Sequence, residues 1–161
     1  MKKTVKLSNF KVLIKGGGEM ASGVACRLHK SGFKILLTEI EQPIAVRRKV
    51  SFCEAVYNTQ TVVEGVEAIL VKTVDDVYMA WDKKKIPLLV DPQCESRISI
   101  KPDVIVDAIL AKKNTGTRLD DAPLVIVLMS AVPNSCSQQS KCGIFIPPCS
   151  HNRITYSIKA H

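Results

Sequence analysis

Residues 10–39 read FKVLIK-GGG-EMASGVACRLHKSG-FKILLTE, and this stretch decides the fold. The apolar run at residues 10–15 predicts a short buried strand, and the three glycines that follow predict a tight turn. Residues 33–38 predict a second buried strand, because they are rich in Leu and Ile. The order of strand, glycine turn, helix and strand predicts a βαβ crossover with parallel pairing.

A helix is predicted between these two strands. Met20, Val24 and Leu28 recur four residues apart, which places them on one face of an amphipathic helix. The helix is expected to end near Gly32, because glycine is the usual residue just past a helix C-terminus. Cys26 falls within this helix and is interpreted as a small packing residue.

Further strands and helices alternate along the chain. The pattern predicts strands at 66–71, 86–90, 103–106 and 124–128, and a helix at 73–85 that opens on a threonine cap. Strands of near-continuous Ile, Leu and Val that alternate with helices belong in a sheet covered on both faces. The predicted fold class is therefore α/β and Rossmann-like, with a mostly parallel sheet and helices on both faces.

The turn after the first strand matches the dinucleotide-binding fingerprint, in the form Gly16-x-Gly18-x-x-Ala21-x-Gly23. Gly16 permits the tight turn, and Gly18 lets the backbone approach a pyrophosphate. Ala21 or Gly23 lets the helix pack closely on the strand. Together with Gly17, these residues would bring the N-terminal N–H groups and the positive dipole end of the helix to the phosphates of a nucleotide-like ligand.

An acid follows the second strand about 20 residues after the glycines, as the fingerprint expects. This acid is Glu39, and its carboxylate could bind ribose hydroxyls. Such an acid favours NAD or another adenosine ligand over NADP, because it would repel a 2′-phosphate. Glu19, at the start of the helix, opposes a phosphate there. The alternative is a glycine turn that only packs the helix on the sheet, with Glu39 in solvent.

Four more charged residues are candidates for the same site. Asp91 and Asp107 each end a predicted strand, so they are expected at the carboxyl edge of the sheet, where ligands bind in open α/β folds. They would shape the pocket or bind a cation, and the alternative is that each caps a loop. Arg47 and Arg48 could bind an anionic group through their guanidinium forks, and the alternative is a solvated basic face.

The whole chain has 161 residues, a formal net charge of +8 and 5% aromatic residues. The basic residues are scattered and aromatic stacking residues are scarce, which argues against a nucleic-acid partner and favours a small anionic ligand. No apolar run approaches the ~20 residues that span a bilayer, so no membrane partner is expected. We expect a cytoplasmic protein whose six cysteines are reduced, in an oligomeric state that the sequence leaves open.

The sequence holds no recognisable catalytic or metal centre. It has no Gly-x-Ser-x-Gly motif, and its three histidines have no evident partners. Cys136, Cys142, Cys149 and His151 match no common zinc spacing, so no metal site is expected. One enzymatic alternative stays open, the Rossmann half of an NAD-dependent oxidoreductase. Its acid or base would come from the lysine pair 112–113.

The last 40 residues differ from the rest of the chain. All 15 acidic residues lie within residues 1–121, and after Leu128 the only apolar run is at 144–146. We therefore divide the chain into a Rossmann-like nucleotide-binding domain at 1–128 and an atypical tail at 129–161.

Long blocks of the sequence resemble the opening part of the YqeB family, whose members are accessory proteins of the selenium-dependent molybdenum hydroxylase system. The first block, VLIKGGGEMASGVACRL at 12–28, contains the glycine turn, and the second, at 38–43, contains Glu39. Further blocks lie at 45–57, 89–92, 102–114 and 121–126.

The resemblance implies a Rossmann-like domain related to the XdhC maturation factors, which handle the molybdenum cofactor before its insertion into hydroxylases. It implies an accessory factor that binds a nucleotide or the nucleotide-bearing molybdenum cofactor, with a molybdenum hydroxylase apoenzyme as partner. The turn at 16–23 would hold the pyrophosphate, Glu39 the ribose, and Arg47 and Arg48 another anionic group. The resemblance names a pathway more firmly than a reaction, so whether the protein is an enzyme stays open.

The chain departs from that family after Ile126. Relatives continue with a glycine-rich segment of the Gly-Pro-Gly-Phe type, whereas this chain reads VLMSAVP at 127–133 and finishes at His161. The departure and the absence of acids suggest the out-of-frame extension of a truncated gene, which would leave an inactive fragment. A genuine lineage-specific tail is the alternative, and an intact, uninterrupted gene would contradict the truncation.

Overall fold

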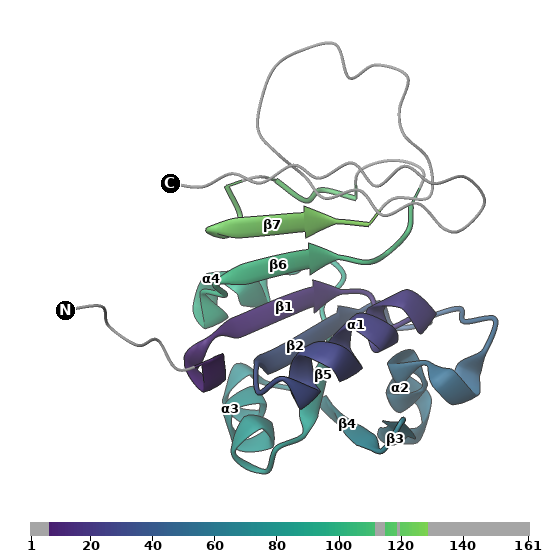
Figure 1. Cartoon of the computed structure of the whole chain (residues 1–161). Helices are drawn as coiled ribbons and strands as arrows, with labels where there is room; N and C mark the ends of the chain where they lie inside the picture. The colour runs from purple at the N-terminus through teal and green to yellow at the C-terminus, as the bar shows by residue number, and fades with distance from the viewer. Residues whose placement is uncertain (1–6, 112–114, 119, 129–161) are drawn as a thin grey trace.

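The fold is built on a single mixed sheet. The computed structural model describes residues 7–111, 115–118 and 120–128. These residues form seven strands in the spatial order β3-β4-β5-β2-β1-β6-β7 (Figure 1). The strands are β1 (Lys11–Lys15), β2 (Lys34–Glu39), β3 (Gln60–Val63), β4 (Val66–Val71), β5 (Ile86–Val90), β6 (Val104–Asp107) and β7 (Leu124–Val127). Neighbouring strands pair in parallel except β3 and β4 at one edge, which confirms the predicted α/β, mostly parallel sheet.

The first two strands and the helix between them form the predicted βαβ unit. The helix is α1 (Glu19–Lys30), and it ends as expected at a glycine. Gly32 has a φ of +93°, and the N–H of Phe33 donates to the carbonyl of Leu28 at 3.1 Å, which completes a Schellman motif. Gly32 is required here because the left-handed conformation strains residues with a Cβ atom.

Helices cover both faces of the sheet, as predicted (Figure 1). The remaining ones are η1 (Leu7–Asn9), η2 (Arg48–Val50), η3 (Phe52–Glu54), α2 (Ala55–Asn58), α3 (Val74–Asp82) and α4 (Ser96–Ile100), where η marks a 3₁₀ helix. In the part of the chain that the structure describes, no helix combines the length and the apolar character needed to cross a bilayer.

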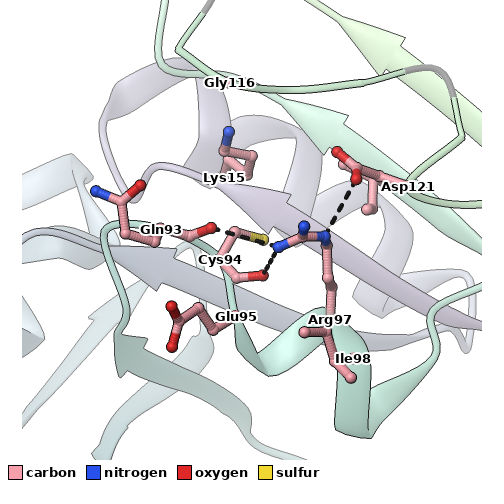
Figure 2. Close-up of a pocket in the computed structure, with 9 residues that line it drawn as sticks. Lys15, Gln93, Cys94, Glu95, Arg97, Ile98, Gly116 and Asp121 are labelled. Carbon is pink, nitrogen blue, oxygen red and sulfur yellow. Dashed lines mark hydrogen bonds and ion pairs between the residues drawn. The ribbon is translucent and has the colours of Figure 1, made fainter.

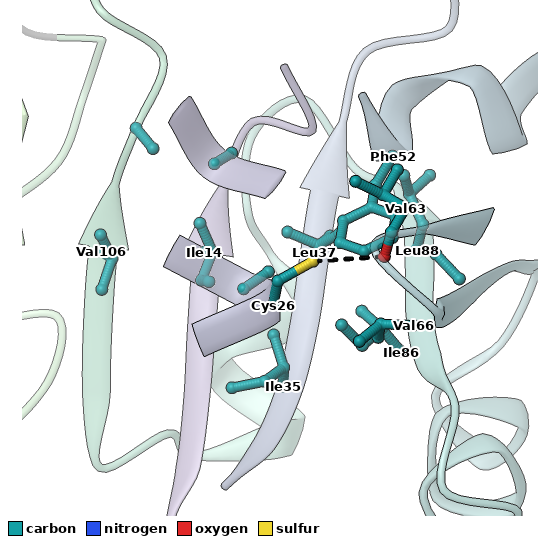
Figure 3. Packing of buried hydrophobic residues seen from close by; sticks show 14 of the residues in the cluster. Ile14, Cys26, Ile35, Leu37, Phe52, Val63, Val66, Ile86, Leu88 and Val106 are labelled. Carbon is teal, nitrogen blue, oxygen red and sulfur yellow. Dashed lines mark hydrogen bonds between the residues drawn. The ribbon is translucent and has the colours of Figure 1, made fainter. Parts of the chain in front are cut away.

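The two faces of the sheet hold separate hydrophobic cores. Ile14 of β1 belongs to the cluster under α1, η3 and α2, and its neighbour Leu13 belongs to the cluster under α3 and α4. This alternation follows from the pleat of a strand, and burial on both faces explains the continuous apolar runs in the sequence. Cys26 lies in the first cluster, 1% exposed, with its thiol 3.6 Å from the carbonyl oxygen of Val63 (Figure 3). Its predicted role as a packing residue is confirmed.

The helix predicted at 73–85 is confirmed but ends earlier. Thr73 caps α3 in a capping box, because its hydroxyl accepts the N–H of Asp76 while the Asp76 carboxylate accepts the N–H of Thr73. The C-terminus was predicted three residues too late. Lys84 has a φ of +56°, and this left-handed residue turns the chain out of the helix.

The sequence did not predict β3 or the short helices α2 and α4. β3 pairs with β4 across a two-residue turn, Glu64-Gly65, in which both residues have positive φ (49° and 76°). Such a turn matches the right-handed twist of a hairpin. The segment at 41–57, expected to be irregular, holds η2, η3 and most of α2.

β1 lies at the point where the strand order reverses. The chain passes from β1 to β2 on one side, and β6 lies against β1 on the other. The crevice outside the carboxyl ends of β1 and β6 is therefore the topological switch point, where ligands bind in open α/β sheets. The predicted glycine turn opens onto this crevice.

Candidate functional site

Gly16 starts the turn between β1 and α1. Its φ is +97°, and its N–H donates to the carbonyl of Thr38 at 2.8 Å, which ties the turn to the end of β2. A Cβ atom here would lie 3.4 Å from the carbonyl oxygen of Ala108, just after β6. Glycine is therefore required by the backbone conformation, whereas a Cβ atom would make only an ordinary van der Waals contact with Ala108.

Gly17 is a glycine for a different reason. A Cβ atom at this position would lie 3.0 Å from the backbone nitrogen of Cys53 in η3. The Cys53 N–H donates to the carbonyl of Gly17 at 2.8 Å, so η3 packs directly on the turn. The carbonyl of Gly17 is thus engaged by η3, and the side of Gly17 that faces η3 has no room for a side chain.

Gly18 is the open position of the turn. It is the N-cap of α1, with a φ of −69°, and nothing lies within 4 Å of the place a Cβ atom would take. Among the described residues, none accepts a hydrogen bond from the backbone N–H groups of Gly18, Glu19 or Met20. These N–H groups of the first helical turn are the donors that an anion at a helix N-terminus uses.

Ala21 and Gly23 were the two candidates for close helix packing. Ala21 is fully buried against the sheet. Gly23 lies on the exposed side of α1, and no atom lies within 4 Å of the place a Cβ atom would take. Ala21 therefore provides the small packing residue of the fingerprint.

Glu39 lies at the end of β2 and holds the glycine turn. Its Oε2 accepts the N–H of Gly17 at 2.7 Å, and its Oε1 accepts the N–H of Ile40 at 2.9 Å. A carboxylate has about four lone-pair sites, so two remain for hydroxyl donors. Glu39 is thus not a merely solvated acid, and its interaction with a ribose stays a prediction.

A cleft of ≈ 530 Å³ lies at the switch point. Its polar lining comes from Gly16, Gly18, Glu19 and Glu39, and its apolar lining comes from Met20, the loop after β2 and the segment 108–110 after β6. This volume is typical of small-molecule sites, which range from about 300 to 1,000 Å³. The structure therefore gathers the glycine turn and Glu39 around one cleft with apolar walls.

Ser22 is a site residue that the sequence analysis missed. Its buried hydroxyl accepts the N–H of Phe52 at 2.8 Å and donates to the carbonyl of Gly18 at 2.8 Å. The Ser22 hydroxyl thereby links η3 to the glycine turn by hydrogen bonds. Ser22 occupies a variable position of the fingerprint, and nothing in the sequence marks its partner 30 residues away.

Arg47 and Arg48 pair with acids of their own chain. The Nε of Arg47 lies 3.7 Å from Glu19 Oε2, so Arg47 reaches the rim of the cleft through Glu19. The Nε of Arg48 lies 3.8 Å from Glu54 Oε2, and its guanidinium lies 4.9 Å from the ring centre of Tyr57. The structure brings Arg47 but not Arg48 to the cleft, and anion binding by either stays a prediction.

Asp107 lies at the predicted edge but on the opposite face of the sheet. It faces Lys15 in the pairing of β1 with β6, and both side chains are more than nine-tenths buried. Thr117 bridges them, because its hydroxyl accepts from Lys15 Nζ at 2.7 Å and donates to Asp107 Oδ2 at 2.5 Å. Asp107 Oδ1 also accepts the N–H of Ile109 at 3.2 Å. This hydrogen bond holds in place the segment 108–110, which lines the cleft.

A second, smaller cavity of ≈ 310 Å³ lies on this opposite face (Figure 2). Figure 2 shows Lys15, Cys94 and Arg97 around it. The Nε of Arg97 donates to Asp121 Oδ1 at 3.1 Å. Burial raises the pKa of the Cys94 thiol to about 11. The thiol is therefore neutral near pH 7 and unsuited to act as a nucleophile.

Asp91 follows β5, where its side chain caps the start of α4, and it lines neither cavity. Its two carboxylate oxygens accept the N–H groups of Glu95 (3.0 Å) and Ser96 (2.8 Å) at the start of α4. This is the capping role that the sequence analysis held as the alternative. A ligand contact by Asp91 has no support in this arrangement.

Several residues singled out from the sequence lie outside the described residues. They are the lysine pair 112–113 and the whole tail at 129–161, with Cys136, Cys142, Cys149 and His151. Within the described ranges, no cluster of three or more His, Cys, Asp or Glu side chains could hold a metal ion.

Comparison with known proteins finds a similar curated protein. Over 117 residues, 73% of this chain, the sequence is 44% identical to "Uncharacterized protein YqeB" of Escherichia coli (strain K12). The chain spans 22% of the length of that relative. No family model and no solved structure matches the chain.

Proposed function

The chain belongs to the YqeB family, and on this premise we propose that it is a nucleotide-binding accessory factor in the maturation of a selenium-dependent molybdenum hydroxylase. The ligand is a nucleotide or the nucleotide-bearing molybdenum cofactor. The binding half of this proposal rests on the cleft at the switch point, and the pathway half rests on the family resemblance.

The cleft supports nucleotide binding because three kinds of group converge on it. The first turn of α1 offers the N–H groups of Gly18, Glu19 and Met20 to a phosphate. Glu39 offers carboxylate oxygens to ribose hydroxyls. The apolar loop after β2 and the segment 108–110 offer surfaces for a heterocyclic ring.

This arrangement favours a binding role over turnover by the chain alone. The groups around the cleft are backbone N–H donors, two carboxylates that are already hydrogen-bonded, and aliphatic side chains. Apart from Glu19 and Glu39, none of the described lining residues is of a type that usually carries acid–base or nucleophilic steps, such as His, Lys, Cys or Tyr. Delivery or protection of a ligand needs no such group.

Thermal unfolding of the full chain tests the binding half. The midpoint is measured alone and with NAD⁺, NADP⁺, ATP, CTP, S-adenosylmethionine or molybdopterin. A ligand at 100 times its Kd adds about 2.7 kcal/mol, which raises the midpoint by roughly 5 to 11 °C. We expect such a rise with one ligand, and a smaller rise in Glu39→Gln, which loses one acceptor. A cooperative transition that none of the ligands moves would contradict the proposal.

The pathway half is tested in cells that make the hydroxylase. Without this gene, the purified hydroxylase should contain less molybdenum than the enzyme from the parent strain. Complementation with the wild-type gene should restore the metal content, whereas a variant that folds but binds no ligand should not. Normal metal content without the gene would contradict the maturation role.

A further inference from the structure

Another cavity, of ≈ 510 Å³, lies at the amino end of β2, the opposite end of that strand from the switch-point cleft. It is lined by η1, the end of α1, the start of β2 and the residues at and just after the end of α3. Its volume is within the range of small-molecule sites, about 300 to 1,000 Å³. The cavity is separate from the candidate nucleotide site, because the two share none of their described lining residues.

Two aromatic side chains, Phe33 and Trp81, form apolar walls of this cavity. The indole N–H of Trp81 donates to the carbonyl of Ile35 at 2.7 Å, and the Tyr78 ring packs perpendicular to the indole with ring centres 5.3 Å apart. Phe33 packs edge to face with Phe10, with ring centres 6.3 Å apart. Because these contacts already hold both rings, a ligand that packs against them immobilises little further side chain.

Three lysines line the cavity beside these rings. They are Lys34, Lys84 and Lys85, and the acid among the described lining residues is Asp82. Lys85 forms an ion pair with Glu67 at 2.6 Å, whereas no described acid lies within ion-pair distance of Lys34 or Lys84. The three lysines and the two acids leave an excess of one positive charge. This excess attracts an anion with a single charge.

His29 also lines the cavity and adds no charge to it. Burial lowers the pKa of the His29 imidazole, and a hydrogen bond with the Lys84 backbone opposes this effect only in part. The imidazole is therefore mostly neutral at pH 7, and the positive charge of the cavity comes from its lysines.

Lys84 occupies a position where glycine is the usual residue. Its φ is +56°, in the left-handed region that a side chain with a Cβ atom disfavours. The N–H of Lys85 donates to the carbonyl of Ala80 at 3.0 Å, so this is the glycine position of a Schellman motif. Strained backbone positions cluster at functional sites. A lysine at this position therefore points to a use for its ammonium group at the cavity.

We propose that this cavity binds a small aromatic carboxylate. The ring packs against Phe33 and Trp81, and the carboxylate lies near the ammonium groups of Lys34 and Lys84. A carboxylate matches the excess of one positive charge, whereas a phosphate monoester carries about −1.5 to −2 at pH 7. The site goes beyond the proposed nucleotide binding and does not depend on it.

NMR titration of the isotope-labelled full chain tests this proposal. Trp81 is the single tryptophan of the chain, so its indole N–H gives one signal from the wall of the cavity. The probes are phenylacetate, its neutral counterpart phenylacetamide, and acetate, which has no ring. We expect phenylacetate to shift this signal to saturation, with a Kd at least about fivefold lower than that of phenylacetamide. Acetate should leave the signal in place over the same concentrations.

Lys84→Gly is the most informative variant. It removes the ammonium group and relieves the left-handed conformation, so a loss of binding cannot be attributed to a less stable fold. We expect it to weaken phenylacetate binding by at least about fivefold. Lys83→Gly is the matched control, because Lys83 is exposed and does not line the cavity. It should leave the affinity for phenylacetate unchanged.

Four results would each overturn the proposal. They are the absence of a saturable shift with phenylacetate, equal Kd values for phenylacetate and phenylacetamide, a shift by acetate as large as that by phenylacetate, and equal effects of the two lysine variants. NAD⁺ should not displace phenylacetate, because the two sites share no described lining residue. Displacement would place phenylacetate in the switch-point cleft and overturn the separate site, whereas failure of NAD⁺ to bind would count against the proposed function alone.

Discussion

Lys15 and Asp107 bring opposite charges together inside the sheet. Their side chains are 7% and 6% exposed, and their nearest charged atoms are 3.8 Å apart. Moving a charge out of water costs several kcal/mol, and a partner offsets this cost only while both are present. Thr117 completes the pair by hydrogen bonds to both residues. The network joins the strand that carries the glycine turn to the strand that carries the far wall of the cleft.

This pairing predicts a strongly non-additive pair of substitutions. Lys15→Met or Asp107→Leu alone should lower the free energy of unfolding by about 3 to 5 kcal/mol, because the remaining charge is buried without its partner. The double variant should recover most of that loss, since an apolar pair needs no compensation. Urea denaturation of the wild type, the two single variants and the double variant gives the four free energies of unfolding of this double-mutant cycle. A double-variant loss equal to the sum of the single losses would contradict it.

At the scale of elements, the residue just after α3, Lys84, has a left-handed backbone conformation that a side chain with a Cβ atom disfavours. Lys84 has a φ of +56°, and the N–H of Lys85 donates to the carbonyl of Ala80 at 3.0 Å, as in a Schellman motif. The left-handed conformation costs a residue with a Cβ atom about 1–2 kcal/mol. Glycine removes this cost but loses more chain entropy on folding.

Lys84→Gly should therefore raise the free energy of unfolding by up to about 1 kcal/mol. Lys83→Gly is the control one residue earlier, where φ is −84° and glycine gains nothing. It should lower stability by about 0.5–1 kcal/mol. Chemical denaturation measures both variants. Equal effects of the two substitutions would show that the left-handed conformation of Lys84 is not the cause.

The same elements show what a sequence can predict. The βαβ unit was predictable because its strands are apolar runs and its helix carries both a periodic face and a glycine stop at Gly32. β3 was missed because its burial alternates only weakly and its turn, Glu64-Gly65, is a less familiar hairpin signal than Asn-Gly. α4 spans five residues, too few for a periodic pattern.

For the candidate site, local patterns predicted positions but not partners. The fingerprint located Gly18 and Glu39 on one cleft, because strand ends and turns follow from local sequence. It did not predict that Gly17 packs on Cys53, that Ser22 binds the Phe52 N–H, or that Asp107 turns to Lys15. These contacts join residues that are far apart in the chain, and a single sequence does not show which distant residues meet in space.

At the scale of the whole molecule, the packing on the two faces of one sheet buries Cys53 and Cys94. Cys53 lies in η3 behind the glycine turn, 2% exposed, and Cys94 lies on the other face, 3% exposed. Burial, together with the nearby carboxylates of Glu39 and Glu54, raises the pKa of the Cys53 thiol to about 11, and burial raises that of Cys94 to the same value. Both thiols are therefore protonated in the folded protein at pH 8.

We predict that iodoacetamide at pH 8 modifies Cys53 and Cys94 far more slowly in the folded protein than in urea, because the thiolate is the nucleophile. The raised pKa also stabilises the fold below pH 9, and this contribution is lost as the pH rises from 9 towards 11. Mass spectrometry of the modified peptides and urea denaturation at pH 8 and pH 10 check both statements. Modification at the same rate with and without urea would contradict the buried position of the thiols.

The central claim is that a nucleotide binds with its phosphates at Gly18, and titration of the full chain with NAD⁺ tests it most directly. Gly18→Ala places a methyl group in open space at an ordinary φ of −69°, so the unliganded protein should unfold at nearly the same temperature. Gly23→Ala is the control on the exposed side of α1 and should stabilise the helix by about 0.5–1 kcal/mol. The account predicts that Gly18→Ala weakens NAD⁺ binding by at least about tenfold while Gly23→Ala leaves it unchanged. Wild-type affinity in Gly18→Ala, or no binding by the wild type, would contradict it.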